Sequence, residues 1–413
     1  MKNISLSFLV LAAAAITWSC SDDKQPWQEI PSSPITGNDA TVTFNGVRSY
    51  GVVNIDTRSE SRAVVTLSNI VPGYTEITIP ADMKQTGDAT FALSGTTDLS
   101  SPPEIFPMSK STALPPIYNM SLSGTVTTSG KAEIAVTSTL TSEAQANFTG
   151  KWTPEKMLPV SVALMEHAPV VIDLAIKNQP EKSEQLSATL SLLGGLALYN
   201  AIGAIDLQSN GSMVIDYSTT VDIARAVSEG MDQTNGIYKA ISDFDASTGP
   251  NLVFWYSRSP YLLITPYIPN ISYKLDVDAG KNPNLNDGAV TEKIEKLITD
   301  LAEMGVDTKT LMDTFSSLNS TGIPVAATAS GSALKIVIDK KMLDPFVSLL
   351  SPALPALDAK LTEYLAQPAN AAIAEIITTQ LFPALGINSL KELGQLWEQD
   401  IESLTITINL VKA

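Results

Sequence analysis

The first part of the chain alternates apolar and polar residues with a period of two. In TEITIP (75–80), Ile77 and Ile79 fall on one face, as expected for a strand with one buried side. The run MSLSGTVTTSGKAEIAVTSTL (120–140) places a Thr-Ser-Gly turn signal between two such segments and predicts a β-hairpin. We therefore expect residues 39–153 to form an all-β domain, either an antiparallel barrel or a sandwich.

The remainder of the chain, residues 154–413, mixes strand and helix patterns. DLQSNGSMVIDYS (206–218) predicts a hairpin whose Asn-Gly turn favours positive φ at both turn residues. NLVFWYSRSPYLLITPYI (251–268) predicts a second strand pair that turns near a proline. ESLTITINLVKA (402–413) alternates throughout and would close the sheet.

Helical periodicity interrupts these strands. The segment from about 183 to 200 and the block 341–397 predict helices, and TEKIEKLITDLAEMG (291–305) has an apolar stripe at helical spacing. Residues 188–205 carry no charge over 18 residues, which is long enough for a membrane span, but glycines interrupt the run. We expect a buried helix there. The predicted fold class is thus α+β, mainly antiparallel β with helical insertions.

The N-terminal residues predict an export signal. MKNISLSFLVLAAAAITWSC (1–20) has a basic start and a short apolar run, and it ends at the only cysteine of the chain. This segment resembles the lipobox of bacterial lipoproteins, although Trp18 departs from the usual small or aliphatic residue. The resemblance implies that residues 1–19 are removed as a signal peptide and that Cys20 is acylated, which would anchor the protein in a membrane.

The residues that follow Cys20 extend this resemblance. Ser21, Asp22 and Asp23 are similar to the surface-export signal of Bacteroidetes-type lipoproteins. The polar, proline-containing stretch 20–38 predicts a flexible tether. The resemblance implies an outer-membrane protein that is exposed on the cell surface.

The order of strand motifs carries a second resemblance. The succession TVTFNG, VVTLSNI, TEITIP, ATFALSG, LSGTVTTSGKAEIAVTS and NFTGKW, over residues 39–152, resembles the calycin-like barrels of uncharacterised Bacteroidetes surface lipoproteins. The hairpins of residues 154–413 resemble the lipocalin-like domains of the same group. The resemblance implies barrels of about eight strands, which either hold a small ligand or are filled by side chains.

Composition excludes several classes of protein. The formal net charge is −17, whereas a nucleic-acid-binding face needs clustered Lys and Arg. A single cysteine excludes an intramolecular disulfide, and a single histidine, His167, excludes multi-histidine metal sites. His167 lacks the G-x-S-x-G context of a serine hydrolase, so we expect it to be structural.

Two groups of residues are candidates for binding. Aromatic residues concentrate in the 251–268 hairpin and predict either a platform for sugar rings, an apolar pocket, or simply core packing; these residues are Trp255, Tyr256, Tyr261 and Tyr267. A loop rich in carboxylate and amide oxygens is the best candidate for Ca²⁺, or it is a solvated loop; its candidate ligands are Asp276, Asp278, Asn282, Asn284 and Asp287.

These observations favour a non-catalytic, lipid-anchored surface protein that binds a glycan or an apolar small molecule and needs no cofactor. Two alternatives remain open at this point. One is a secreted glycoside hydrolase that uses paired carboxylates, which the 43 acidic residues leave possible. The other is a structural or interaction subunit that binds an outer-membrane protein through a flat apolar patch.

Overall fold

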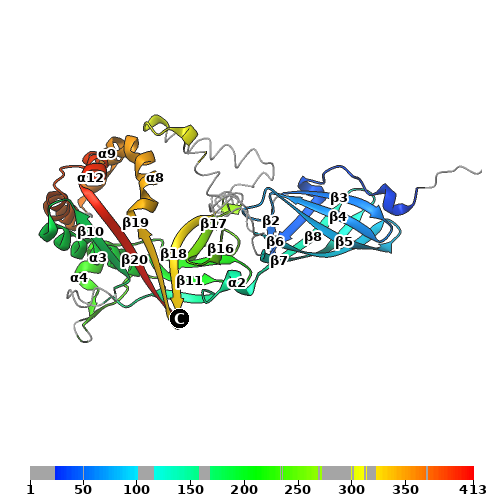
Figure 1. Ribbon diagram of the computed structural model, residues 1–413, viewed down its shortest axis with the longest axis horizontal. Coiled ribbons are helices and arrows are strands. Elements are labelled where there is room, and N and C mark those ends of the chain that lie inside the picture. The colour runs from blue at the N-terminus through cyan, green and yellow to red at the C-terminus, as the bar shows by residue number, and fades with distance from the viewer. Residues whose placement is uncertain are drawn as a thin grey trace, which may run out of the picture.

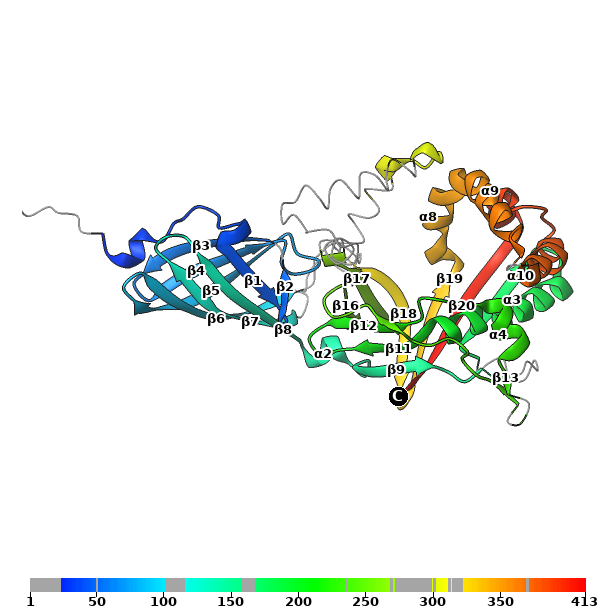
Figure 2. The same ribbon diagram turned by 180° about the vertical axis from the view of Figure 1, so that it is seen from behind.

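The computed structural model describes residues 24–413 except residues 50, 101–115, 158–167, 233, 235, 268–269, 272–298, 300–301, 311–312, 314–321 and 369–370. Figures 1 and 2 show an elongated molecule in which two β-sheet bodies lie in line. The helices gather at the end remote from the N-terminal turn. The fold is α+β and mostly antiparallel, as the sequence predicts.

The first body is an eight-stranded β-barrel. Its strands are β1 (Ala40–Phe44), β2 (Val47–Ser49), β3 (Val52–Ser59), β4 (Arg62–Ser68), β5 (Glu76–Gly87), β6 (Thr90–Ser100), β7 (Pro116–Thr127) and β8 (Ala132–Leu140). Strands β3 to β8 pair in chain order, and β1 lies between β8, to which it is parallel, and β2. Ile35 exchanges two backbone hydrogen bonds with Val53 and covers the edge of β3.

Side chains fill the interior of the first barrel. The inward positions of every strand carry aliphatic or aromatic residues, and Val53, Ile55, Val65, Ile79 and Phe91 have no exposed surface. The alternation that predicts strands in TEITIP and ATFALSG therefore also identifies the core. Burial of this contiguous apolar surface, at roughly 25 cal/mol per Å², stabilises the barrel.

Two glycines allow the adjacent strands β6 and β7 to bend. A Cβ atom on Gly95 would lie 2.3 Å from the backbone oxygen of Pro80, and one on Gly124 would lie 2.1 Å from that of Glu133. Gly95 follows the buried Leu93 on the inward face of β6, and Gly124 lies between the buried Leu122 and Val126 on that of β7. Glycine thus permits the close approach of neighbouring strands on which the curvature of the barrel depends.

Both ends of the first barrel are covered. At one end, the turn η1 (Pro26–Glu29) and Ile30 lie against the core, remote from the second body (Figure 1). At the other end, Phe254 of the second body packs on Phe44 with ring centroids 5.6 Å apart. The hydroxyl of Tyr267 donates a 2.5 Å hydrogen bond to the backbone oxygen of Asn69. The two bodies consequently share one hydrophobic core.

The second body is built on a longer sheet. Its strands are β9 (Gly150–Pro154), β10 (Val170–Ile176), β11 (Ile202–Leu207), β12 (Ser212–Tyr217), β15 (Ala246–Ser247), β16 (Val253–Arg258), β17 (Tyr261–Pro266), β18 (Ile323–Ser330), β19 (Ala333–Asp339) and β20 (Ile401–Lys412). The predicted hairpins at 206–218 and 251–268 and the closing strand at the C-terminus are confirmed. A separate two-stranded ribbon contains β13 (Met231–Asp232) and β14 (Ile237–Tyr238).

Strand β9 differs from its sequence prediction. NFTGKW is expected to be the last strand of the first domain, but β9 pairs with β11 and with β20 in the second sheet. Strand β9 therefore connects the two ends of the strand order from β11 to β20, so that eight strands form a closed circuit of pairings. Strand β10 pairs with β20 and lies outside this circuit. Trp152 of β9 is fully buried inside this circuit, under the ammonium group of Lys412.

The inner wall of the second body is only partly covered. The register places Ile336 opposite Ile408 and Leu334 opposite Leu410, all facing inward. Near the β16–β17 turn the inward residues are buried, whereas towards the helical end inward isoleucines keep partly exposed surface; these isoleucines are Ile264, Ile323, Ile338 and Ile406.

Helix α3 (Pro180–Ala201) covers the outer edge of β10. Its serines recur every fourth residue and so lie on one face. The hydroxyls of Ser183, Ser187 and Ser191 accept hydrogen bonds of 2.8 to 2.9 Å from the backbone N–H groups of Ile176, Leu174 and Ile172 respectively. These backbone N–H groups at the edge of β10 are thus hydrogen-bonded within the protein and are not available to pair with a strand of another chain.

Beside α3, four helices pack around a second, smaller core. They are α8 (Lys340–Leu350), α9 (Leu354–Leu365), α11 (Phe382–Leu385) and α12 (Leu393–Gln399), with a π-helical turn at Ile376–Leu381. Helix α4 (Ile223–Glu229) contacts α3, and α10 (Ala371–Glu375) contacts α4 and α9. The predicted helical block at 341–397 is confirmed. Among the helices that the structure describes, none is long and apolar enough to cross a membrane.

Candidate functional site

The four aromatic candidates do not lie on one exposed surface. Trp255 and Tyr256 are neighbours in a strand, so they point to opposite sides of the sheet. Trp255 is fully buried and donates a 3.1 Å hydrogen bond to the backbone oxygen of Gln208. Tyr256 and Tyr267 are buried at the junction of the two bodies, and only Tyr261 is half-exposed. Ligand binding by this set stays a prediction.

The other candidates lie outside the described residues. This holds for Cys20, for the proposed Ca²⁺ loop and for His167; the loop residues concerned are Asp276, Asp278, Asn282, Asn284 and Asp287. Within the part of the chain that the structure describes, no group of three or more His, Cys, Asp or Glu side chains is arranged to hold a metal ion.

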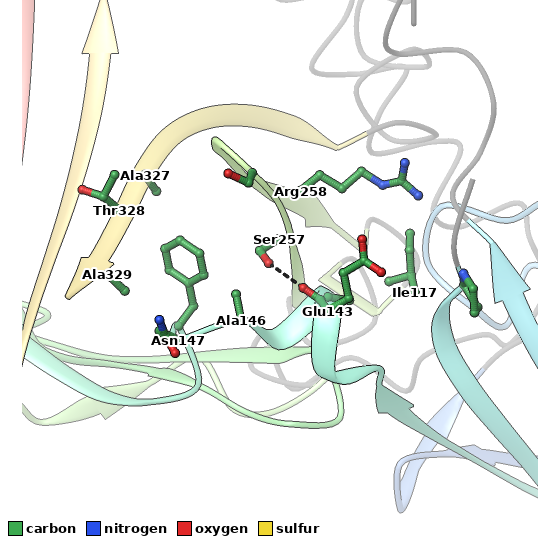
Figure 3. A pocket seen from close by; sticks show the side chains of 13 residues that line it. Ile117, Glu143, Ala146, Asn147, Ser257, Arg258, Ala327, Thr328 and Ala329 are labelled. Carbon is green, nitrogen blue, oxygen red and sulfur yellow. Dashed lines mark hydrogen bonds between the residues drawn. The ribbon is translucent and has the colours of Figure 1, made fainter. Parts of the chain in front are cut away.

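A pocket of about 310 Å³ lies between α2 (Ser142–Gln145) and the second sheet, and we call it the α2 pocket (Figure 3). Its walls come from the start of β7, from α2 and the residues after it, from the β16–β17 turn, and from β18. Figure 3 shows Ala327 and Ala329 on one side of the pocket and Glu143 and Arg258 on the other.

Helix α2 is held in place by a short local network. The hydroxyl of Thr141 caps the helix by accepting a hydrogen bond from the N–H of Ala144 at 3.3 Å, and it donates one to Pro116 at 3.0 Å. After the helix, the Phe148 carbonyl accepts a 2.7 Å hydrogen bond from the buried Trp152 indole. The pocket wall formed by Ala144 and Phe148 is therefore fixed at both ends.

The walls of the α2 pocket are mainly small and apolar. Ala144, Ala327 and Ile117 are buried, and Phe148 is only 7% exposed. Small side chains leave room that larger aliphatic residues would occupy, which is why a cavity exists here. A sugar stacks on an exposed aromatic face, whereas the ring of Phe148 is buried among alanines. This surface therefore suits an aliphatic group better than a sugar.

The rim of the α2 pocket is polar and carries two opposite charges. Glu143 projects from α2, and Arg258 ends strand β16. The hydroxyl of the buried Ser257 donates a 3.3 Å hydrogen bond to the backbone oxygen of Glu143, which ties α2 to β16. Ser259 adds a further polar residue to the lining, and Thr328 lies at its edge.

Tyrosines behind the rim are held neutral. Burial raises the pKa of Tyr74 well above its usual value, the nearby Tyr256 raises it further, and the Arg258 guanidinium opposes this shift. Burial likewise raises the pKa of Tyr118, with smaller contributions from Tyr74 and Tyr256. These phenols therefore act as uncharged packing and hydrogen-bonding groups at neutral pH.

A second and more polar cavity, of about 600 Å³, lies beside α4. It contains three aspartates, of which Asp245 receives hydrogen bonds from the hydroxyl of Thr219 at 2.6 Å and from its N–H at 2.9 Å. These bonds lower the pKa of Asp245, the hydroxyl contributing most. A glycosidase acid needs a raised pKa, so the shift at Asp245 is opposite to that requirement.

The α2 pocket was not predicted from the sequence. One local signal was present, because Thr141 followed by Ser-Glu-Ala is typical of a helix N-terminus. Two of the other walls, the β16–β17 turn and β18, come from residues more than 100 positions away, which no local pattern brings together. Comparisons with protein-family models, with curated proteins and with solved structures found no match to this chain.

Proposed function

We propose that this chain is a lipid-anchored protein of the bacterial outer membrane that binds a small apolar molecule at the α2 pocket without catalysing a reaction. The α2 pocket carries the proposal, because it combines a small apolar interior with a few polar groups, as small-molecule sites do. Surface exposure and a calycin-like origin of the barrels are parts of the same proposal, supported by the N-terminal and strand motifs of the sequence.

The first barrel has a supporting role in this proposal. Its interior is filled, one end is covered by the N-terminal turn, and the other end packs on the second body. A rigid, filled barrel that follows the tether would hold the second body away from the membrane. The α2 pocket lies next to the junction, on the second body.

The structure favours an apolar molecule over a glycan as the ligand. Three of the four aromatic rings expected to stack on sugars are buried, and the α2 pocket is lined by alanines. The hydrolase alternative requires two carboxylates across a cleft, and the α2 pocket contributes Glu143 alone to that arrangement.

Binding can be tested by filling the pocket. We expect Ala327→Leu to abolish the thermal shift that an apolar small molecule produces in the soluble form lacking residues 1–20, because the new side chain occupies the cavity. Ala326→Leu is the matched control, since its neighbouring position on β18 points to the opposite face. Equal ligand responses of both variants and the original protein would contradict the proposed site.

Membrane anchoring has its own test. Cells that express the full chain are grown with an alkyne-labelled fatty acid, which should label the protein through Cys20. We expect Cys20→Ala to abolish the label and to release the protein from the membrane fraction. Labelling that persists in this variant would contradict acylation of Cys20.

A further inference from the structure

We propose that the end of the first barrel remote from the second body, which we call the η1 end, rests on the lipid headgroups of the membrane that holds Cys20, with Trp27 in the interfacial layer. This inference rests on the proposed function, because it takes the acylated Cys20 as the anchor. It follows from the short length of chain between that anchor and the barrel, and from the residues that the η1 end exposes.

Little chain separates Cys20 from the η1 end. Residues 21–23 lie between Cys20 and the described part of the chain, and even a fully extended backbone places the Cα atom of Lys24 within about 14 Å of that of Cys20. Pro26 then begins η1, which packs on β3. Acyl chains on Cys20 are buried in the membrane, so the η1 end is held close to the lipid surface.

The chain from η1 to β1 is fixed to the first barrel over its length. Ile30 and Ile35 are both buried in the core of the barrel. The backbone hydrogen bonds between Ile35 and Val53 measure 2.7 and 3.1 Å. The distance between the barrel and the membrane is therefore limited to what the few residues before η1 can span.

The β3–β4, β5–β6 and β7–β8 turns lie at the same end as η1. Successive antiparallel strands reverse direction, so alternate turns share one end of the barrel. Pro31 lies against the β7–β8 turn, where a Cβ atom on Gly130 would be 3.2 Å from its ring. The N–H of Thr128 donates a 3.0 Å hydrogen bond to the carbonyl of Ala89, which joins two of the turns. Short, interconnected turns and η1 thus form this end.

Trp27 gives the η1 end a side chain suited to the lipid–water boundary. Its ring packs against the barrel core and stays partly exposed. The backbone around it is fixed, because the N–H of Gln25 donates a 2.8 Å hydrogen bond to Oε1 of Gln28, and the N–H of Gln28 donates one of 2.8 Å to the Gln25 carbonyl. Indole rings concentrate at membrane interfaces, where the apolar body and the polar N–H both find partners.

The charges of the η1 end nearly cancel. The segments that form it are residues 24–29, 58–62, 87–90 and 127–131. Together they carry four basic and three acidic residues, whereas the whole chain has a net charge of −17. Arg58 and Arg62 form ion pairs with nearby aspartates at 2.6 and 2.8 Å. This end can therefore approach lipid headgroups without the repulsion that the acidic remainder would meet at an anionic surface.

Contact at the η1 end would set the orientation of the whole molecule. The two bodies lie in line and share one hydrophobic core, so the second body is at the opposite end from the membrane (Figures 1 and 2). The first barrel then separates the α2 pocket from the lipid, and a ligand reaches that pocket from water rather than from the bilayer.

The test uses quenching of tryptophan fluorescence by lipids. The chain from residue 20 onward is coupled through Cys20, its only cysteine, to a maleimide lipid in phosphatidylcholine vesicles whose acyl chains carry bromine near the headgroup. Bromine quenches an indole that it contacts. We expect the original protein to lose part of its emission relative to the same protein on unbrominated vesicles, and we expect Trp27→Phe to show no such loss.

Trp397→Phe is the matched control, because Trp397 is buried at the helical end of the molecule. This variant should lose as much emission to bromine as the original protein. Acrylamide in the water gives the opposite readout, since coupling to vesicles should protect the emission of Trp27, measured as the difference between the original protein and Trp27→Phe. Equal bromine quenching of the original protein and Trp27→Phe, or acrylamide quenching of Trp27 that coupling leaves unchanged, would overturn the docking.

Chemical coupling separates this inference from the proposed anchoring. If cells attach no alkyne-labelled fatty acid to Cys20 while the coupled protein shows the expected quenching, acylation fails and the η1 end stands as a lipid-binding surface. If cells label Cys20 while bromine leaves the Trp27 emission of the coupled protein unchanged, the anchor stands and this inference fails.

Discussion

The two β-sheet bodies of this protein use similar strands but fill their interiors to different degrees. In the first barrel, inward residues such as Ile55 and Phe91 have no exposed surface, and both ends are covered. In the second body, inward residues such as Ile338 and Ile406 stay partly exposed, and alanines leave the α2 pocket open. The arrangement of the strands alone therefore does not decide whether a ligand fits inside a sheet body; the sizes of the inward side chains decide it.

We expect the largest loss of stability from a cavity in the core of the first barrel, compared with one in the interior of the second body. Phe91→Ala should destabilise the protein by about 3–5 kcal/mol, because it opens a cavity in a filled interior. Ile406→Ala should cost less than about 2 kcal/mol, since its side chain is already partly hydrated. Urea unfolding followed by circular dichroism measures both. Equal losses would mean that the two interiors are equally well packed.

The next prediction concerns the junction that joins the two bodies. Burial raises the pKa of Tyr267 to about 12, against a slightly opposing hydrogen bond with Ser49, whereas the unfolded chain titrates near pH 10. The folded state therefore keeps the full contribution of the neutral Tyr267 phenol to its free energy of unfolding below pH 10. As the pH rises from 10 to 12, the protein loses roughly 2–3 kcal/mol of that free energy.

Tyr267→Phe isolates this contribution. The variant should lose less stability than the original protein between pH 10 and 12, although it is less stable at pH 7 because Asn69 loses its donor. Denaturation midpoints at pH 7, 10 and 12 measure the difference. If both proteins lost the same stability between pH 10 and 12, Tyr267 would not be the titrating group, and the loss would be attributed to Tyr74 and Tyr118.

A smaller effect tests the curvature of the first barrel. Gly124→Ala should cost about 1–3 kcal/mol, because the added Cβ meets the backbone of β8. Gly87→Ala is the control on β5, where the nearest atom would be 3.8 Å away, and it should change stability by less than about 0.5 kcal/mol. Similar denaturation midpoints for the two variants would show that close strand contact at Gly124 is unimportant.

The smallest global effect concerns the covered edge of the second sheet. Ser187→Ala removes the acceptor for the Leu174 N–H and should cost about 1 kcal/mol. Amide hydrogen exchange should accelerate at Leu174 more than at neighbouring residues of β10. Thr189→Ala, on the exposed side of the same helix, is the control. Unchanged exchange at Leu174 would contradict the role of the serine.

Local sequence patterns predicted most of the strands. They predicted the wrong backbone conformation for one hairpin turn. Asn210-Gly211 was expected to have positive φ at both residues, but only Gly211 does. The Gly211 N–H bonds to the carbonyl of Gln208 in a four-residue loop that ends in a glycine bulge, and Gly130 does the same with Thr127. The sequence signal located both hairpins because glycine is required in either turn form.

Features that depend on distant contacts could not be predicted in this way. Strand β9 has only five residues and obtains both of its partners from the second sheet, so its local pattern does not reveal its domain. The aromatic residues of the 251–268 hairpin are buried on both faces of their sheet, because the two bodies pack together at that point. The α2 pocket likewise exists only where four separate segments meet.

The most direct measurement follows the alanine methyl signals of the first barrel and of the second body while a ligand is added. The soluble protein, labelled with ¹³C at alanine methyl groups, is titrated with an apolar small molecule that raises its melting temperature. We expect shifts at Ala144, Ala327 and Ala329 and none at Ala63, Ala81 and Ala132, which are buried in the filled barrel. Shifts confined to the first barrel, or unperturbed α2-pocket methyls on saturation, would contradict it.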